Sequence, residues 1–272
     1  MSDVNPETPV KKRILITVKT IPTESIEYDE TVCTAGITED GEWIRIYPVP
    51  FRKLNMNQRY KKYQWIEAEV FRNPKDFRPE SYKCNWQSIK LLDSIEDWDE
   101  KYRSCVEKMH VYEDFDELIT LAKRKPAVLS LAVFKPKLII GCEVHKRDIS
   151  EQIEKQEKIK TSRTKDLFEN NKSFVPAEPL PFKLTYTFTD SQDKKHSLMV
   201  EDWEVYRLFY RYKDDFDLAK RMVEEKYREL ASSEHDTYFF VGTRLSAHYM
   251  TTNPFSIIGV FYPPKEKQPL LF

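Results

Sequence analysis

The first third of the chain alternates apolar and polar residues with the period of two that is typical of half-buried β-strands. Five stretches have this pattern: residues 13–21, 31–37, 43–47, 63–71 and 82–92. Asp40-Gly41, between the second and third, supplies the positive φ angles that a tight hairpin needs. Short connections join the first three stretches, so the pattern predicts a meander or small β-barrel.

The middle of the chain mixes helical and strand patterns. Residues 97–108 and 115–123 have helical spacing, and the second helix begins with acidic residues and ends on basic ones, which suits the helix dipole. Two apolar, β-branched runs at 127–134 and 138–144 predict strands. Residues 149–170 are strongly charged, which predicts a solvated helix or helical connector.

Three prolines between residues 171 and 182 favour an extended linker, so we expect a domain boundary there. The remainder predicts an α+β domain over 183–264, followed by a tail at 265–272. Its expected elements are a hairpin that starts near 182, one long helix at 203–230, and strands at 237–243 and 255–262. The fold class is therefore α+β, with a β-rich first domain over 1–170 that carries helical insertions and a smaller second domain that carries a long helix.

Composition limits the classes of function. The chain has 272 residues, of which 40% are hydrophobic, and its 44 basic against 45 acidic residues leave a net charge of −1. Any attraction to nucleic acid must therefore be local. Four dispersed cysteines without a CxxC pair, and five histidines without ligand spacing, argue against a zinc site and a disulfide framework. We expect no metal or cofactor, and a cytoplasmic protein with no membrane partner, because no apolar run approaches the roughly 18–20 residues of a membrane span.

One face of the strand at 43–47 combines rings and a cation. Trp43, Arg45 and Tyr47 alternate with Ile44 and Ile46, so the two sets lie on opposite faces. Between residues 45 and 75 eight basic residues face only two acidic ones. Rings that stack on bases and cations that contact phosphates suit single-stranded nucleic acid. The predicted binding surface consists of Trp43, Arg45, Tyr47, Arg52, Lys61 and Lys62. The competing interpretation is that the rings are core residues and the cations solvate a loop.

The block CTAGITEDGEWIR resembles the opening of the dual OB-containing domain family, a bacterial and phage group. The resemblance covers mainly residues 13–52, and its motif positions hold Cys33, Ala35, Gly36, Ile37, Asp40, Gly41, Trp43, Ile44 and Arg45. The sequence departs from the family pattern after Arg45. The resemblance implies an OB-like barrel that binds DNA or RNA in genome defence or repair, and it implies no specific reaction.

Two alternatives remain open. Glu201, Asp202 and Glu204 could hold Mg²⁺ in a metal-dependent nuclease, although acidic residues at a helix start also favour the helix dipole. The last residues, QPLLF, are similar to the peptide with which bacterial proteins dock on the replication sliding clamp. In that interpretation Gln268, Leu271 and Phe272 contact the clamp, and the protein is an adaptor without nucleic-acid contact. Our leading hypothesis is a non-enzymatic nucleic-acid-binding protein.

Overall fold

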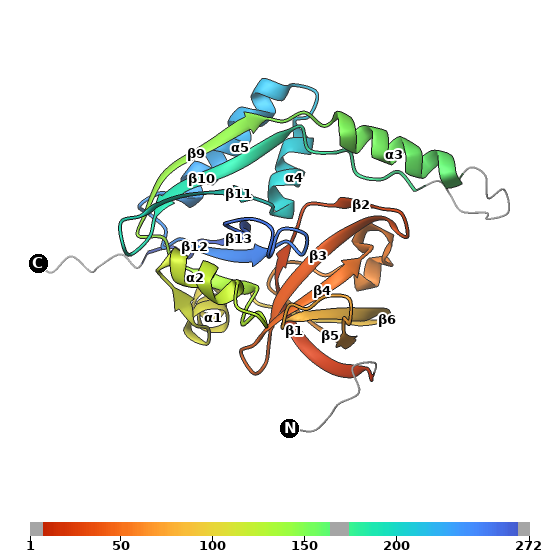
Figure 1. The fold of residues 1–272 in the computed structure, drawn as a ribbon, viewed down its shortest axis with the longest axis horizontal. Coiled ribbons are helices and arrows are strands. Elements are labelled where there is room, and N and C mark those ends of the chain that lie inside the picture. Colours follow the sequence, from red (N-terminus) through yellow and green to blue (C-terminus); the bar gives the residue numbers. More distant parts are fainter. Residues whose placement is uncertain (1–7, 164–173, 266–272) are drawn as a thin grey trace, which may run out of the picture.

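The computed structural model describes residues 8–163 and 174–265, and its N-terminal part is a closed five-stranded barrel (Figure 1). The barrel strands are β1 (Val10–Lys19), β3 (Asp29–Thr38), β4 (Trp43–Val49), β5 (Gln64–Arg72) and β6 (Ser81–Ser94). Their order is β1-β5-β6-β4-β3, and β3 pairs back onto β1. Only β4 and β6 run parallel among these pairs, and β2 (Thr23–Ser25) extends β3. All five strands predicted in this region are confirmed.

The barrel closes where β1 and β3 approach each other most tightly. A Cβ on Gly36 would lie 2.4 Å from the carbonyl oxygen of Leu15, so only glycine fits this position without displacing the backbone. The predicted hairpin turn is also present, since Gly41 has a φ of 78° between β3 and β4. Ile14, Ile44 and Ile66 fill the barrel interior together with other apolar residues of these strands.

The second part of the chain forms a mixed seven-stranded sheet. Its strands are β7 (Val111–Tyr112), β8 (Leu131–Phe134), β9 (Leu138–Lys146), β10 (Phe182–Thr189), β11 (Lys195–Val200), β12 (Tyr238–Thr243) and β13 (Phe255–Phe261). The order is β7-β8-β12-β13-β11-β10-β9, with β7–β8 and β11–β13 parallel. The α+β class is therefore confirmed.

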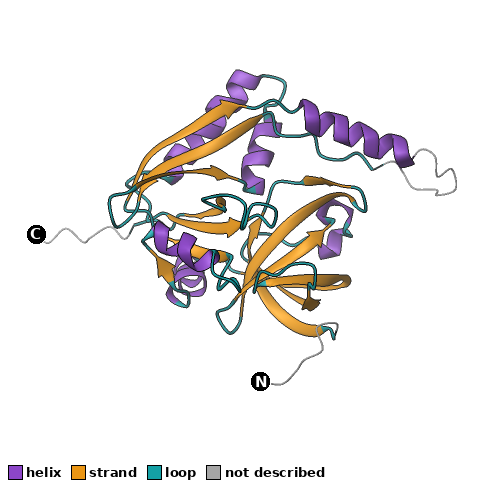
Figure 2. Ribbon diagram, in the orientation of Figure 1, coloured by secondary structure: helices purple, strands orange, loops and turns teal. Residues whose placement is uncertain are grey.

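Helices cover one face of this sheet, and the barrel covers the other face at β8, β12 and β13 (Figure 2). Phe239 and Val241 pack with residues of α2 (Phe115–Ala122), α4 (Trp203–Arg211) and α5 (Phe216–Leu230). Tyr238 and Phe240 point the other way, into a cluster with Leu15 and Val18 of β1. Two-sided burial explains why β8, β12 and β13 are buried throughout and read as continuous apolar runs.

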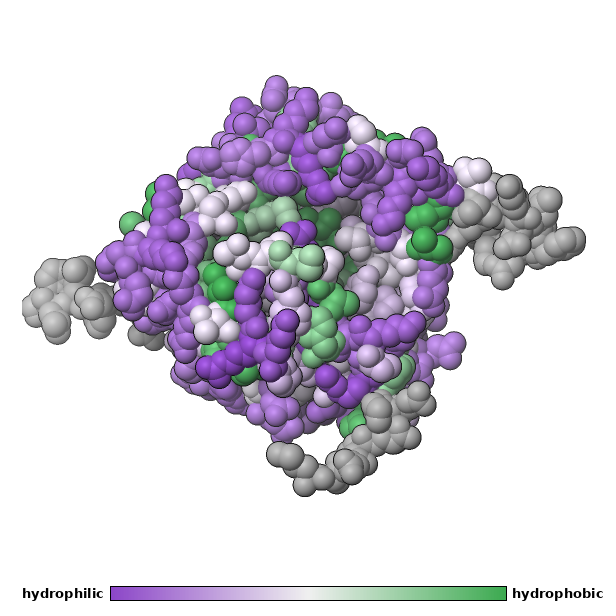
Figure 3. Space-filling view, in the orientation of Figure 1, coloured by the Kyte–Doolittle hydropathy of each residue, from purple (hydrophilic) through white to green (hydrophobic). Residues whose placement is uncertain are grey.

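Two further helices differ in what they contact. α1 (Trp98–Tyr102) continues into a π-helical turn, Arg103–Glu107, and together they connect the barrel to the second sheet. α3 (Ser150–Arg163) is the predicted charged helix, and it extends away from the sheet (Figure 1). In Figure 3 hydrophilic residues cover most of the visible face, and white and green residues gather near its centre.

Two expectations differ from the structure. The helix expected at 203–230 is two helices, because Asp215 caps a new helix by accepting a hydrogen bond from the backbone N–H of Leu218. The boundary expected at 171–182 instead lies between two strands of one sheet, since β9 and β10 pair antiparallel. The chain changes sheets between β6 and β7, where no proline-rich segment marks the change. No described helix is both long enough and apolar enough to cross a membrane.

Candidate ligand pocket between the barrel and the second sheet

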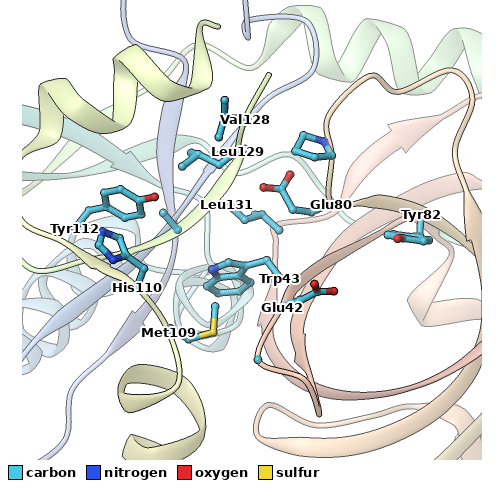
Figure 4. A pocket seen from close by; sticks show the side chains of 13 residues that line it. Glu42, Trp43, Glu80, Tyr82, Met109, His110, Tyr112, Val128, Leu129 and Leu131 are labelled. Atoms are coloured by element: carbon cyan, nitrogen blue, oxygen red, sulfur yellow. The ribbon is translucent and has the colours of Figure 1, made fainter. Parts of the chain in front are cut away.

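A pocket of 390 Å³ opens where the barrel meets the second sheet (Figure 4). Its lining contains four rings and two carboxylates, contributed by Trp43, Tyr82, His110, Tyr112, Glu42 and Glu80. Met109, Leu129 and Leu131 are among its apolar lining residues. Its volume lies within the roughly 300–1,000 Å³ of small-molecule sites. We therefore take this pocket as the candidate functional site.

Trp43 reaches the pocket because it begins β4 directly after the hairpin turn. The turn is closed by hydrogen bonds from the N–H of Thr38 to the carbonyl of Glu42 and from Gly41 back to Thr38. The indole is partly exposed, and its other contacts include Phe240, whose ring lies edge-on at 5.6 Å. One side of Trp43 is thus anchored in the interface between the two sheets while the residue still lines the pocket.

The other rings come from segments far apart in the sequence. Tyr112 and His110 flank the start of β7, with ring centroids 4.3 Å apart. Burial and the charges of Glu117 and Glu80 raise the pKa of Tyr112, so its hydroxyl stays protonated at neutral pH. Tyr82 lies on β6, and the guanidinium of Arg72 is 5.0 Å from its ring centroid.

Glu80 is held in place by the segment before β8. One carboxylate oxygen accepts a hydrogen bond from the N–H of Ser130 and the other from its hydroxyl, both at 2.7 Å. The Ser130 hydroxyl also accepts a 2.6 Å hydrogen bond from Arg45. A chain of polar contacts therefore connects the barrel, the pocket and the second sheet.

Arg45 is buried, with 2% of its surface exposed, which contradicts its predicted place on an open binding face. Its guanidinium donates to the Ser81 hydroxyl, to Ser130 and to the carbonyl oxygen of Thr243. Burial and the charge of Arg78 lower the pKa of Arg45. As predicted, the Arg45 side chain lies on the face of β4 opposite Ile44 and Ile46. That face is covered by the second sheet and does not meet solvent.

A second buried arginine supports the same junction. Arg78 forms an ion pair with Asp76 and donates to the carbonyl oxygen of Thr243, which Arg45 also contacts. Burial opposes ionisation of Asp76, but its bonds with Arg78 lower the pKa of this carboxyl overall. The loop between β5 and β6 is thereby fixed against the second sheet, next to Glu80.

The other predicted cations do not share a surface with Trp43. Arg52 pairs with Glu30 at 2.8 Å, and Lys62 is largely buried beside Asp202 and Glu204 at 3.3 and 3.5 Å. Although burial opposes its charge, these carboxylates raise the pKa of Lys62. Tyr47 is 38% exposed and Lys61 is exposed, but neither lines the pocket. The single aromatic and basic face is therefore not present, because cations that are close in sequence pair with distant segments.

The carboxylates considered for a nuclease have structural partners. Glu201 accepts a 2.6 Å hydrogen bond from Ser256, and Asp202 caps α4 through the N–H of Glu204. Among the described residues no group of three or more His, Cys, Asp or Glu side chains is arranged to hold a metal ion. The proposed clamp-binding residues Gln268, Leu271 and Phe272 lie outside the described residues.

Three cations lie near pocket residues in the sequence without lining the pocket. A Cβ on Gly41 would lie 3.3 Å from the carbonyl oxygen of Lys108 and 3.8 Å from its Cβ, so Lys108 adjoins the hairpin at the pocket. Arg124 and Lys125 are exposed on the segment that leads to Val128, another lining residue. Within the described part of the chain, none of these three cations forms an ion pair.

Sequence reasoning found Trp43 and missed the other pocket residues. Glu80 lies between the strands predicted at 63–71 and 82–92, and Tyr82 begins the second of them, where the alternating pattern indicates a strand but no binding role. His110 and Tyr112 lie just past the first sheet, where no pattern indicated that they meet Trp43. A signal did exist in the loop, where Asp76, Arg78 and Glu80 alternate charge over five residues.

The fold and pocket define a two-part protein: a closed barrel joined to a mixed sheet, with an aromatic and acidic site at the junction. The chain belongs to the family described as "Domain of unknown function (DUF8757)", whose model matches residues 111–272. A second family model, "Domain of unknown function (DUF8758)", matches residues 10–107. The two matches meet where the chain passes from the barrel to the second sheet. No curated protein matches the sequence.

Proposed function

We propose that this protein binds single-stranded DNA or RNA by taking one base into the pocket while phosphates lie against the cations around it. The observation that carries the proposal is the pocket lining itself, in which Trp43, Tyr82 and Tyr112 surround a space of 390 Å³. Base stacking on such rings contributes about 1–3 kcal/mol per base. The carboxylates exclude a phosphate from the interior, and in this proposal Lys108, Arg124 and Lys125 contact phosphates outside it.

We also propose that the barrel is OB-like. Numbered in chain order, its five strands follow the order 1-2-3-5-4 and close on strand 1, with strands 3 and 5 parallel. This is the strand order of the OB-fold, in which the face of strands 2 and 3 and the loop between strands 4 and 5 bind oligonucleotides. Here the corresponding loop contributes Glu80 and strand 3 contributes Trp43. The second sheet covers the middle of that face, which limits binding to the end where the pocket opens.

Titration of fluorescently labelled single strands and duplexes of DNA and RNA at two salt concentrations tests the proposal. We expect single strands to bind more tightly than duplexes, because a paired base cannot enter the pocket without unstacking. Affinity should fall as salt rises. Equal binding of all forms, or no binding at low salt, would contradict the proposal.

A second candidate is a cationic ligand such as a methylated ammonium group. It is favoured by the two carboxylates and by the absence of lysine and arginine from the pocket lining. Aromatic rings bind such cations through their π faces. Binding of trimethyllysine peptides, with no binding of oligonucleotides, would favour this candidate over the first.

A further inference from the structure

A second aromatic surface is formed by the loop between β5 and β6 and the loop between β12 and β13. The ring of Phe77 stacks on that of Tyr249, with centroids 4.8 Å apart and an angle of 16° between the planes. The Tyr249 hydroxyl donates to the carbonyl oxygen of Arg124 at 3.0 Å, which brings a third segment to the same place. Phe77 is 47% exposed although it is a large apolar residue, so part of its ring is open to a ligand.

The buried ring of His248 fixes the position of this ring pair. Its Nε2 donates to the carbonyl oxygen of Ala122 at 2.7 Å, and its Nδ1 lies 2.8 Å from the hydroxyl of Thr243. The imidazole is edge-on to Phe77 at 5.0 Å and to Tyr249 at 4.7 Å. A ligand therefore meets a flat ring that is already oriented.

Cations are concentrated at this surface. The three segments that meet here, residues 73–78, 123–128 and 244–251, contain six basic residues and one acidic residue, Asp76. Asp76 is buried and paired with Arg78, so it does not offset the other charges. The other basic residues are Lys75, Lys123, Arg124, Lys125 and Arg244. In a chain with a net charge of −1, this local excess of positive charge suits a polyanion.

The same surface adjoins the pocket. The ammonium of Lys125 is 5.1 Å from the ring centroid of Tyr249, and the segment continues to Val128, which lines the pocket (Figure 4). Phe77 precedes the lining residue Glu80 by three residues, so their Cα atoms are at most about 11 Å apart. Nucleotides that are close together in one strand can therefore reach both Phe77 and the pocket.

We propose that Phe77 is a second stacking site, which holds a base near the one in the pocket while the surrounding cations contact the phosphates of the strand. This inference rests on the proposed function and extends the interface beyond one nucleotide. Stacking on a ring tolerates every base, so the site adds affinity without sequence preference. Basic and apolar residues also suit an anionic membrane, but an oriented ring pair beside an aromatic pocket favours bases.

Short single strands with abasic positions test the inference on the unaltered protein. One strand carries a base at every position, and a second strand of equal length carries one base and is abasic elsewhere, so the two have the same number of phosphates. We expect the first strand to bind roughly ten-fold more tightly, because a second base stacks on Phe77. Equal affinity would overturn the second site and leave the pocket site intact. No binding of either strand would overturn both proposals.

The variant Phe77→Leu tests whether this ring provides the gain. Leucine keeps an apolar side chain but has no flat π face, so the ratio of the two affinities should fall toward one while the one-base strand keeps its affinity. Phe77→Tyr keeps the ring and should keep the ratio. Tyr47→Ala is the matched control, because Tyr47 is an exposed ring four residues beyond Trp43 on β4 and does not line the pocket. An unchanged ratio in a folded Phe77→Leu protein would overturn the assignment.

Two further measurements on the wild type keep the inference testable if Phe77→Leu does not fold. Photo-crosslinking of a strand that contains 5-iodouracil should label the peptide that contains Phe77, and crosslinks confined to other peptides would overturn the assignment. Sedimentation with anionic phospholipid vesicles should leave the protein in the supernatant. Sedimentation with the vesicles, together with equal affinity for the two strands, would assign this surface to a membrane instead.

Discussion

Arg45 of the barrel donates a 2.6 Å hydrogen bond to the hydroxyl of Ser130, which lies 85 positions further along the chain, directly before β8 of the second sheet. The same hydroxyl donates to Glu80, so one serine connects a buried cation to the carboxylate of the pocket. A buried polar network of this kind is stable only when each of its members has a partner. The geometry of the pocket therefore depends on the contact between the two sheets.

Replacing Arg45 by methionine should destabilise the protein by about 2–4 kcal/mol, because Ser130 and the Thr243 carbonyl lose a buried donor. Arg45→Lys should recover only part of this loss, since an ammonium lacks the fork that reaches both groups. The free energy of unfolding from urea denaturation measures the effect. Arg103→Met, at an exposed position of the π-helical turn, is the control and should change the free energy of unfolding by less than about 0.5 kcal/mol. If Arg45→Met also lowers the free energy of unfolding by less than about 0.5 kcal/mol, the buried polar network contributes little to stability.

Gly36→Ala should also destabilise the barrel, by about 3 kcal/mol, because the new Cβ would lie 2.4 Å from the Leu15 carbonyl and 2.6 Å from Ile14. Gly141→Ala provides a matched strand control, since no heavy atom lies within 4 Å of its Cβ position. Thermal denaturation of both variants measures the difference. Equal melting temperatures for the two variants would contradict the close approach of β1 and β3.

Lys19 gives a pH-dependent prediction. Burial, only partly offset by Glu204 and Asp202, lowers the pKa of Lys19 from 10.5 to about 8. Between about pH 8 and pH 10.5, Lys19 carries a proton less often in the folded protein than in the unfolded chain. Lys19 therefore makes the free energy of unfolding rise with pH in this interval. Buried cysteines with raised pKa values act in the opposite direction, and comparison with Lys19→Met removes their contribution.

The stability of the wild type relative to Lys19→Met should increase by about 1.5 kcal/mol from about pH 8 to about pH 9.5. Urea denaturation at several pH values measures this change. Lys61→Met, at an exposed lysine of the barrel, should show no such trend. A constant difference between wild type and Lys19→Met would mean that the folded protein keeps Lys19 charged throughout this interval.

The cations around the pocket should control how binding depends on salt. Each phosphate contact contributes about 0.7–0.9 to the slope of log affinity against log salt, so Lys108→Met or Arg124→Met should lower the slope by nearly one. Lys90→Met, on the other end of β6 from Tyr82, is the control. If the slope of log affinity against log salt changes equally in all three variants, the phosphates do not contact Lys108 or Arg124 specifically.

The barrel could be predicted because its signals are local. Alternating residues and the Asp40-Gly41 turn specify strands and a hairpin regardless of what packs against them. The second sheet was divided in the prediction because β9 and β10 pair across a long, proline-containing segment. No periodicity encodes such a pairing, and prolines interrupt a helix or strand without ending a sheet.

The predicted binding residues on β4 also show that a local pattern does not reveal contacts with distant parts of the chain. Trp43, Arg45 and Tyr47 do alternate with Ile44 and Ile46, as the pattern required. Whether a strand face meets solvent or a second sheet depends on residues such as Phe240 and Ser130, far along the chain. Arg45 was therefore assigned to solvent when it is buried, and Glu80, whose partner is Ser130, had no visible role.

The proposed function depends on Trp43 more than on any other residue, and the affinity of Trp43→Ala for a short single strand tests it directly. Trp86→Ala is the matched control, because Trp86 is also partly exposed on the barrel but packs against Tyr28 instead of lining the pocket. Loss of one stacked base should weaken binding roughly ten-fold or more. We expect that loss for Trp43→Ala and wild-type affinity for Trp86→Ala. Wild-type affinity in a folded Trp43→Ala protein would contradict a base in this pocket.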